Sequence, residues 1–522
     1  LSEPTSKLIH IEGANETPAT QKDLLEGLRE NLVNLTEVLG LSVDELTETQ
    51  EDEPQETVKS IIKEMQELTF APHEISGNDT QVFADLLTDS IERLIKALGL
   101  NEMSLSAESE NKPQELALKA QLQDLHALNH SMFKEDIIYL DNGATTFKPK
   151  SVLNKMNEYY ETYSANAHRG DYSISYKVDV EFENARKKIA EFIGADTEEV
   201  VFTSGATEGL NIIATGFFEK LLEPGDEIVI TNAEHASNVL PWFRLAKKVG
   251  AVIKYIPLDA NLHVTLDNVK SVVTPRTKVI SIAEITNVVG DVRPIKEICA
   301  WAHENNIFVV VDGAQSVPHK KTNVKESDAD FLVFSGHKMC GPTGIGVLYG
   351  KKELLEEVEP LTLGGGMNES FDNENEVYLK DIPHRLESGT PNIAGAIGLG
   401  EAVTYLESVG MDKIMLHEQR LKEYLVDKLR KLPFINIVNE EADSGIVAFN
   451  VEGIFSQDVA YFLNKYNICV RAGNHCAKIL KKSIGVKNTI RVSLYFYNTY
   501  EELDNLVELL SNKDKIMKEM ME

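Results

Sequence analysis

The stretch FSGHKMCGPTGIG, residues 334–346, decides how the rest of this sequence is interpreted. A short apolar run ends there in Ser335, Gly336, His337 and Lys338, and the chain then turns through glycines and a proline. A lysine held in a pocket beside other cationic groups can have its pKa lowered enough to form a Schiff base with a carbonyl compound. An ordinary surface loop can have the same pattern, so this stretch predicts a reactive lysine only in combination with other residues.

Similar short apolar runs alternate with amphipathic helical segments through the middle of the chain. Runs that lack alternating polar positions are typical of parallel strands covered on both faces. Their order predicts an α/β fold with a mostly parallel sheet flanked by helices, in which ligands bind beyond the carboxyl ends of the strands. The runs are EVVFT (199–203), EIVIT (227–231), VIKYI (252–256), KVISIAEI (278–285), FVVVDG (308–313) and DFLVFS (330–335).

Two further turns follow predicted strands and carry polar groups. In VVVDGAQS, residues 309–316, a buried strand delivers Asp312 at its carboxyl end, with Gln315 just beyond it. A carboxylate in this place suits a pyridinium nitrogen, although an aspartate also caps turns. In TSGATEGLN, residues 203–211, a strand leads through glycine into a helix that starts near Thr207. Free backbone N–H groups and hydroxyls at such a start predict a phosphate site.

Two other features are weak when taken separately. An imidazole, His235, follows a strand in EHASNVLPW, and Cys476 lies late in the chain in RAGNHCA, residues 471–477. A lone cysteine is most often a small buried side chain. The combination and order of all these segments, rather than any one of them, indicates a catalytic site.

The chain of 522 residues is long enough for two or three structural units. Residues 1–136 contain 10 Lys and Arg against 28 Asp and Glu, a net charge of −18 out of −31 for the whole chain. Hydrophobic residues at helical spacing predict short helices there, separated by polar linkers. The predicted units are an acidic helical N-terminal extension (1–136), a large ligand-binding domain (137–390) and a smaller C-terminal α+β domain (391–522).

Composition excludes several classes of function. The net charge, 52 − 83 = −31, argues against binding to nucleic acid or anionic membranes. No apolar run approaches the ~20 residues that span a bilayer, and the opening LSEPTSKLIH predicts no secretory signal. The cysteines are too few and too scattered for a disulfide framework or a four-cysteine zinc site, which favours reduced thiols in a cytoplasmic protein without a metal. They are Cys299, Cys340, Cys469 and Cys476.

With these motifs in this order, the chain from about residue 137 to 510 resembles the SufS-like, or group II, cysteine desulfurases. These belong to the class V aminotransferase family of pyridoxal-phosphate enzymes, which have the fold-type I architecture. The short loop between Arg471 and Cys476 resembles the second group, because the first group carries its cysteine on a longer loop. Further matching motifs are YLDNGATT (139–146), AHRGDYSIS (167–175), EITNVVGDV (284–292), VDGAQSVPH (311–319), ESGTPNIAG (387–395) and RVSLYFYNT (491–499).

The resemblance implies a role for each matching residue. Lys338 would form the Schiff base with pyridoxal 5'-phosphate and then take the substrate α-proton, and Cys476 would accept the sulfur. The cofactor ring would contact Asp312 at its nitrogen, Gln315 at its phenolic oxygen and His235 on its face. Arg491 would bind the substrate carboxylate, with Asn287 and Ala144 nearby. The cofactor phosphate would be held by Ala206, Thr207, Ser335, His337 and, from a second subunit of a homodimer, Thr390.

The implied function is that of a cysteine desulfurase. This transferase converts L-cysteine to L-alanine and supplies persulfide sulfur for iron–sulfur cluster assembly, through an acceptor protein of the SufE or SufU kind. A selenocysteine lyase or a related C–S or C–Se lyase is the alternative enzyme. A sulfur-carrier scaffold that has lost turnover is disfavoured because Lys338, Asp312 and Cys476 are all present.

Two departures from the family pattern leave alternatives open. Cys340 stands where many relatives have an aromatic residue, and it is either a small buried filler or an oxidation-prone accessory thiol. The acidic extension either docks a sulfur acceptor or caps the dimer, or it only increases solubility.

Overall fold

The computed structural model describes residues 137–521, apart from residues 168, 169 and 486. The described residues belong to one compact unit. The helices predicted within residues 1–136 lie outside the described residues.

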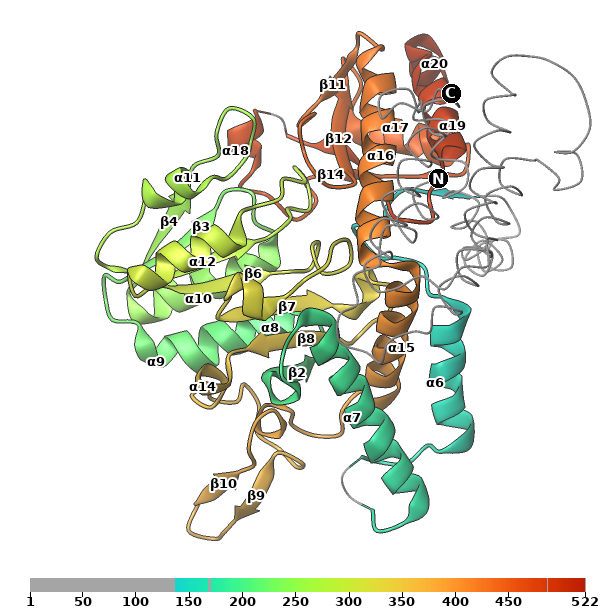
Figure 1. Ribbon diagram of the computed structural model, residues 1–522. Coiled ribbons are helices and arrows are strands. Elements are labelled where there is room, and N and C mark those ends of the chain that lie inside the picture. Colours follow the sequence, from blue (N-terminus) through green and yellow to red (C-terminus); the bar gives the residue numbers. More distant parts are fainter. Residues whose placement is uncertain (1–136, 168–169, 486, 522) are drawn as a thin grey trace, which may run out of the picture. The chain divides into compact units, whose positions relative to one another are not determined.

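A mixed sheet of seven strands forms the centre of the described part (Figure 1). The strand order is β2-β8-β7-β6-β5-β3-β4, and the five strands from β7 to β4 pair in parallel. β8 is antiparallel to both of its neighbours. The predicted α/β fold with a mostly parallel sheet is confirmed. The strands are β2 (Val200–Thr203), β3 (Glu227–Thr231), β4 (Val252–Ile256), β5 (Thr277–Ala283), β6 (Phe308–Asp312), β7 (Phe331–Ser335) and β8 (Gly346–Gly350).

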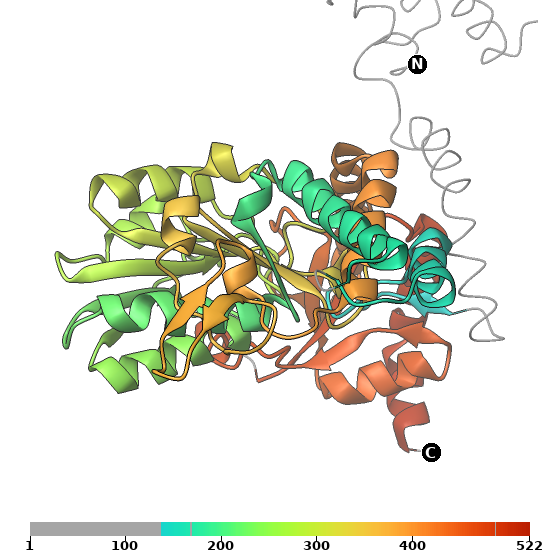
Figure 2. The same ribbon diagram turned by 90° about the horizontal axis from the view of Figure 1, so that it is seen from below.

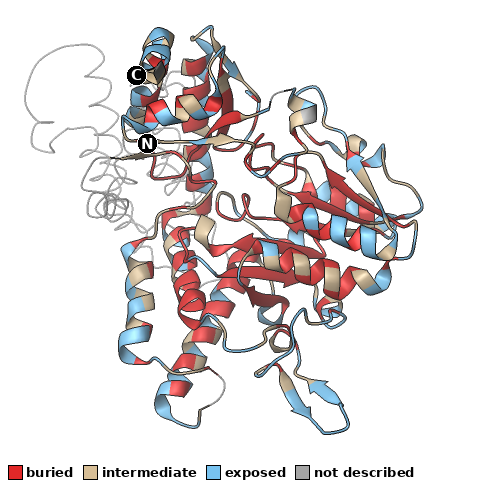
Figure 3. Cartoon of the chain, turned by 180° about the vertical axis from the view of Figure 1, so that it is seen from behind, coloured by how far each residue is buried: buried red, intermediate tan, exposed pale blue. Residues whose placement is uncertain are grey.

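Helices cover both faces of this sheet because alternate strand residues point to opposite sides. In β6, Val309 and Val311 join one apolar cluster, whereas Val310 joins the other. Figures 2 and 3 show the two helical layers and the buried strands between them. The first cluster includes residues of α7 (Ser173–Ile193), α11 (Leu266–Lys270), α12 (Ile295–Glu304), α13 (Val324–Ser327) and α15 (Ile393–Val409), and the second includes residues of α8 (Ala206–Ile212), α10 (Leu240–Val249) and α14 (Lys352–Leu355).

The strand VIKYI differs from the expectation of a strand covered on both faces. It forms β4, the edge of the sheet, where Val252 is 44% exposed and Tyr255 36% exposed. Lys254, in the middle of the run, forms an ion pair with Glu227 of the neighbouring strand. Apolar content alone did not identify this edge strand, because β-branched and aromatic residues suit both edge strands and central strands.

The C-terminal part has a sheet and an apolar core of its own. Its sheet has the order β11-β12-β15-β14, and β1 (Ile138–Tyr139) pairs in parallel with β13 (Ile468–Cys469). The division at residue 390 stays a prediction. The elements are α16 (Met411–Arg430), β11 (Ile435–Ile437), β12 (Ile446–Val451), α17 (Ser456–Asn464), β14 (Arg471–Gly473), α18 (Lys481–Ile484), β15 (Thr489–Ser493), α19 (Tyr500–Leu510) and α20 (Lys513–Met521).

Two smaller features complete the fold. Helix α6 (Lys150–Thr162) packs against α15, and a hairpin of β9 (Asn368–Phe371) and β10 (Val377–Leu379) extends away from the large sheet (Figure 1).

A buried ion pair joins helix α7 to the loop that follows the hairpin. Both guanidinium nitrogens of Arg186 contact the Glu387 carboxylate, at 2.6 and 3.0 Å. The same carboxylate accepts the backbone N–H of Phe202, and Arg186 also donates to the carbonyl of Val200. The Arg186 side chain is fully buried, and its second carboxylate partner, Glu183, is partly exposed, so loss of Glu387 would remove the buried one of its two partners.

We therefore expect Glu387→Gln to lower the free energy of unfolding by about 3 kcal/mol, because removing one partner of a buried pair is strongly destabilising. Urea unfolding followed by circular dichroism measures this change. Glu326→Gln is the matched control, since Glu326 pairs with Lys296 on the exposed surface and should matter little. Equal stability of the Glu387 variant and the wild-type protein would show that the ion pair between Arg186 and Glu387 does not stabilise the fold.

Candidate active site

A cavity of about 260 Å³ lies at the carboxyl ends of β5, β6 and β7, where the fold predicted a ligand site. It brings together twelve of the thirteen residues that the sequence indicated. Thr390 is the exception and lies on an exposed loop outside the cavity. The twelve lining residues are Ala144, Ala206, Thr207, His235, Asn287, Asp312, Gln315, Ser335, His337, Lys338, Cys476 and Arg491.

Lys338 ends the single turn that follows β7, and this residue, with its amine, is half-buried in the lining of the cavity. Burial lowers the pKa of this amine from 10.5 to about 8. The negative charge of Asp312 opposes the shift, and the positive charge of Arg491 adds to it. At pH 7 about a tenth of the Lys338 amine is therefore neutral and nucleophilic, far more than for an ordinary lysine.

Several hydrogen-bond donors converge on the peptide group just before Lys338. The carbonyl oxygen of His337 accepts from the Thr146 N–H at 3.0 Å, the Thr145 hydroxyl at 3.0 Å and the Lys148 ammonium at 3.1 Å. Burial also lowers the pKa of Lys148 to about 8. The sequence analysis did not single out these three residues, although they lie in or next to the motif YLDNGATT. They fix the direction in which Lys338 leaves the main chain.

Asp312 and Gln315 lie beyond the end of β6. The Asp312 carboxylate accepts the N–H of Ala314 at 3.0 Å, and burial raises its pKa. The Gln315 amide donates to the carbonyl of Gly143 at 2.8 Å, while its own oxygen has no partner in the described part of the chain. A buried acceptor without a partner costs free energy unless a ligand satisfies it.

The turn at Gly205 brings the start of α8 against the end of β7. The Ala206 N–H donates to the Ser335 hydroxyl at 2.9 Å, and the hydroxyls of Thr207 and Ser237 lie 2.7 Å apart. Gly205 has a φ of 155°, a conformation that suits glycine. Ser237, which the sequence analysis did not single out, adds a hydroxyl to the predicted phosphate site.

His235 lines the same cavity with a neutral ring. Burial, followed by the charges of Lys338 and Arg491, lowers its pKa to about 4. Its Nδ1 accepts the N–H of Ser237 at 3.1 Å, so that the proton of the neutral ring is on Nε2.

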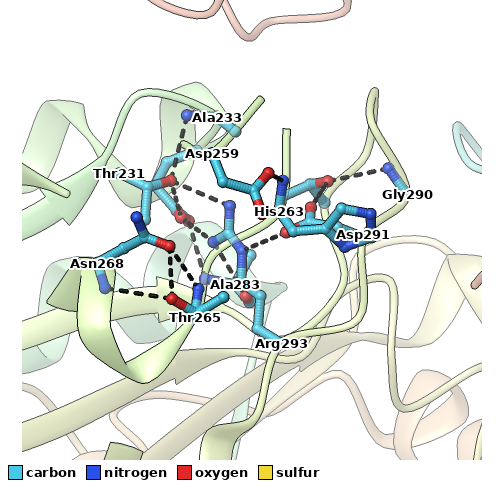
Figure 4. A network of polar contacts seen from close by, with 12 residues as sticks. Thr231, Ala233, Asp259, His263, Thr265, Asn268, Ala283, Gly290, Asp291 and Arg293 are labelled. Atoms are coloured by element: carbon cyan, nitrogen blue, oxygen red, sulfur yellow. Dashed lines mark hydrogen bonds and ion pairs between the residues drawn. The ribbon is translucent and has the colours of Figure 1, made fainter. Parts of the chain in front are cut away.

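The chain that precedes His235 is held by a buried charged network (Figure 4). Arg293 donates to the Thr231 hydroxyl and to the Asp291 carboxylate, both at 3.1 Å. Arg293 also pairs with Glu234, the residue before His235. All three charged side chains are fully buried, so the network fixes this segment at the carboxyl end of β3.

Arg491 comes from β15 and closes the cavity from the C-terminal part. It donates to Asp141 at 2.7 Å and to the backbone carbonyl of Asn287 at 3.0 Å, while its Nε has no partner in the described part. Asp141 also accepts from Arg471 at 2.9 Å. Two arginines thus share one carboxylate, which leaves one positive charge for an anionic group. The sequence analysis assigned no role to Asp141 or Arg471, although both lie in quoted motifs.

Cys476 is exposed on a short loop that is anchored on both sides. The Asn287 amide donates to the carbonyl of His475 at 2.7 Å, and the Ala236 N–H donates to the carbonyl of Cys476 at 2.9 Å. His475 and Cys476 have φ values of 50° and 59°, a left-handed conformation that non-glycine residues seldom adopt. The surrounding contacts therefore hold the backbone that carries Cys476 in place at the cavity.

The other cysteines have different surroundings. Cys340 is fully buried, and burial raises the pKa of its thiol to about 12. This favours the interpretation of Cys340 as a small buried filler over that of a reactive thiol. Cys299 is also buried, and Cys469 is half-buried.

Within the described ranges, His, Cys, Asp and Glu form no cluster that could hold a metal ion. None of the helices in these ranges is long and apolar enough to cross a membrane.

Comparison with known proteins identifies a family for this chain. Residues 138–506 match the family Aminotransferase class-V. A "Probable cysteine desulfurase" of Halalkalibacterium halodurans is 43% identical over 373 residues, which cover 71% of this chain and 92% of that protein. The apo cysteine desulfurase of Thermococcus onnurineus NA1 has a TM-score of 0.70 and 38% identity, over 72% of this chain and 94% of that chain.

A more distant structure shares the fold alone. A mutant of C-DES, described with glycine covalently linked to its PLP cofactor, has a TM-score of 0.64 and 21% identity. The similarity covers 73% of this chain and 99% of that chain.

The lowered pKa of Lys338 gives a test of the site's electrostatics. Reductive methylation with isotope-labelled formaldehyde, after hydroxylamine has removed any bound aldehyde, should show the Lys338 ammonium losing its proton near pH 8. Asp312→Asn should move this midpoint to lower pH, because the Asp312 charge stabilises the ammonium. Asp328→Asn, at an exposed carboxylate paired with His303, is the control and should leave it unchanged. A midpoint at the ordinary lysine value of 10.5 would contradict the burial argument.

Proposed function

This chain belongs to the class V aminotransferase family and is a pyridoxal-phosphate-dependent cysteine desulfurase, and on that premise we propose that Cys476 receives the sulfur of L-cysteine as a persulfide while L-alanine is released. One observation carries this proposal. A single cavity is lined by a half-buried lysine, a buried arginine and an exposed cysteine. A transaminase would need the first two but not the thiol.

The residues of the cavity fit pyridoxal phosphate. Lys338 would hold its aldehyde carbon, and Asp312 would pair with its pyridine nitrogen. Burial raises the pKa of Asp312, and no described residue forms an ion pair with its carboxyl group. A protonated pyridine nitrogen would supply that positive partner and stabilise the carboxylate. The unpartnered oxygen of Gln315 would accept a hydrogen bond from the hydroxyl group on the cofactor ring. When bound, the cofactor withdraws electrons from the substrate α-carbon and thereby makes its proton acidic.

The remaining contacts to the cofactor would be made to the face of its ring and to its phosphate. The neutral ring of His235 would stack on the cofactor face and exclude water from that side. The Ala206 N–H and the hydroxyls of Thr207 and Ser335 would bind the phosphate, together with His337. This group of donors supports the assignment because they already converge at the start of α8.

Substrate binding would depend on Arg491. Its planar guanidinium suits a bidentate contact with a carboxylate, and its unpartnered Nε is available for that purpose. Asp141 and the Asn287 carbonyl hold the guanidinium in place, and Asn287 and Ala144 line the same part of the cavity. Lys338 Nζ would then take the proton from the substrate Cα, which its pKa near 8 permits.

Sulfur transfer would follow at Cys476. Its thiolate attacks the substrate sulfur, a new S–S bond forms, and the bond between that sulfur and the substrate Cβ breaks. The bonding pair remains with the carbon, which takes up a proton and leaves as part of alanine. Because the loop is anchored through the carbonyls of His475 and Cys476, the thiol needs no large movement to reach the cavity.

Removing the thiol tests the proposal directly. Cys476→Ala should lose at least 100-fold in both sulfide and alanine release from L-cysteine, while the colour of the bound cofactor stays, because only the sulfur acceptor is removed. Both products are measured in the presence of pyridoxal phosphate and a reductant. Cys469→Ala, at the half-buried thiol, is the matched control. Retained activity of the Cys476 variant would show that a lyase-type reaction operates instead.

We also propose a homodimer, in which Thr390 of one subunit reaches the cofactor phosphate of the other. Thr390 is exposed and lies outside its own cavity. Large apolar side chains are exposed on the preceding hairpin, where Phe371 is 72% and Tyr378 60% accessible (Figure 3). Apolar surface of this kind is typical of a contact between proteins.

Phe371→Ser combined with Tyr378→Ser should therefore shift the protein from dimer to monomer at micromolar concentration and weaken cofactor binding. Light scattering after size exclusion and cofactor titration measure the two effects. The control is Phe455→Ser with Tyr461→Ser, since these side chains are 54% and 60% exposed elsewhere, at α17. An unchanged dimer with the hairpin variant would place the interface on another surface.

Transfer beyond Cys476 requires an acceptor that comes to the enzyme. The anchored loop supports this proposal because it limits the reach of a persulfide. We propose a small thiol protein of the SufE or SufU kind in iron–sulfur cluster assembly. A cytoplasmic location is consistent with the four free cysteines of the chain.

A further inference from the structure

The chain around Cys476 is basic although the protein as a whole is strongly acidic. Asp and Glu make up 83 of the 522 residues, about one in six. The 42 residues from position 459 to 500 contain neither, but they contain seven Lys or Arg. Cys476 lies within this interval, so the acid-free segment surrounds the residue that is proposed to carry the sulfur.

Three lysines of this segment follow Cys476 closely in the chain. Lys478 and Lys487 are exposed and Lys481 is half-buried, and none of the three forms an ion pair or side-chain hydrogen bond with another described residue. Several other exposed lysines are paired, as Lys352 is with Glu198. We call Lys478, Lys481 and Lys487 the lysine surface.

The carboxylates of two described loops that pack in the same apolar cluster accept hydrogen bonds within those loops and form no ion pair with the lysine surface. Ile484, in the helix that contains Lys481, packs in one apolar cluster with Leu262 and Val438. In those neighbouring loops, Asp259 accepts the N–H of His263, and Glu441 accepts from Asn261. These local contacts leave the positive charge of the lysine surface without a dedicated partner.

We propose that the lysine surface docks an acidic face of the protein that accepts sulfur from Cys476; this rests on the proposed function. The anchored Cys476 loop requires the acceptor thiol to approach to bonding distance, so the acceptor must cover the surface beside it. Unpaired cations at the rim of such a contact speed association with an acidic partner and repel basic ones. Because exposed charges are screened, the preference must fall as salt rises.

The step that this docking serves is balanced without an oxidant or reductant. The acceptor thiolate attacks the outer sulfur of the Cys476 persulfide, and a new S–S bond forms. The S–S bond to Cys476 Sγ breaks, and its electron pair leaves with Sγ as a thiolate. That thiolate takes up the proton that the acceptor thiol released, so the acceptor becomes the persulfide and Cys476 is restored.

The test uses the full-length holoenzyme and two synthetic thiol peptides, Glu-Glu-Gly-Cys-Gly-Glu-Glu and its counterpart with glutamine in place of each glutamate. The enzyme is loaded with L-cysteine, and transfer of sulfur to each peptide is followed by mass spectrometry after alkylation. The acidic peptide should react about tenfold faster at low salt, and the difference should disappear at high salt. The enzyme's own acidic residues 1–136 are present, so a preference seen here is for an external acceptor.

Replacing Lys478, Lys481 and Lys487 with Gln should remove the preference while sulfide release with a small neutral thiol stays unchanged. The matched control replaces Lys150, Lys247 and Lys321, which are exposed lysines outside the acid-free segment, and should keep the preference. Equal rates for the two peptides on the wild-type enzyme would overturn the docking surface, as would a preference that survives in the lysine-surface variant. Failure to form any persulfide on the wild-type enzyme would instead overturn the proposed function.

Discussion

The partial burial of Lys338, just after the end of β7, is the constraint on which the rest of the site depends. Burial makes the ammonium costly and brings its pKa to about 8, so the neutral amine is populated where the enzyme needs it. An exposed lysine would have a much smaller neutral fraction at the same pH and would react with an aldehyde, or take up the α-proton, more slowly. The donors that converge on the His337 carbonyl, among them Lys148, keep this amine directed into the cavity.

The second half of the site is supplied by the C-terminal part of the chain. Arg491 and Cys476 approach the cavity from β15 and the loop before it, and Asn287 contacts the chain at both places. Through this one residue, the position of the carboxylate-binding guanidinium is coupled to that of the thiol. A substrate held at Arg491 would thus have its sulfur presented to a thiol whose backbone is already held in place, which favours sulfur transfer over transamination.

Much of this arrangement could be predicted from the sequence, because strand-ending motifs in an α/β sheet gather at one edge. All six predicted strands are present, and Asp312, Ser335 and Lys338 line the cavity as expected. The contacts that orient these groups could not be predicted. Asp141 meets Arg491 across 350 positions of the chain, and Lys148 meets the His337 carbonyl across 189. Local patterns carry no information about such pairs, nor about the antiparallel placement of β8.

The central claim is that Cys476 is the residue that accepts the substrate sulfur. The most direct measurement is to mix the holoenzyme with one equivalent of L-cysteine without reductant, alkylate it, digest it and locate the additional sulfur by mass spectrometry. The account predicts a persulfide on the peptide that contains Cys476. Additional sulfur on Cys340 or Cys469 instead, or alanine formation without any bound sulfur, would contradict it.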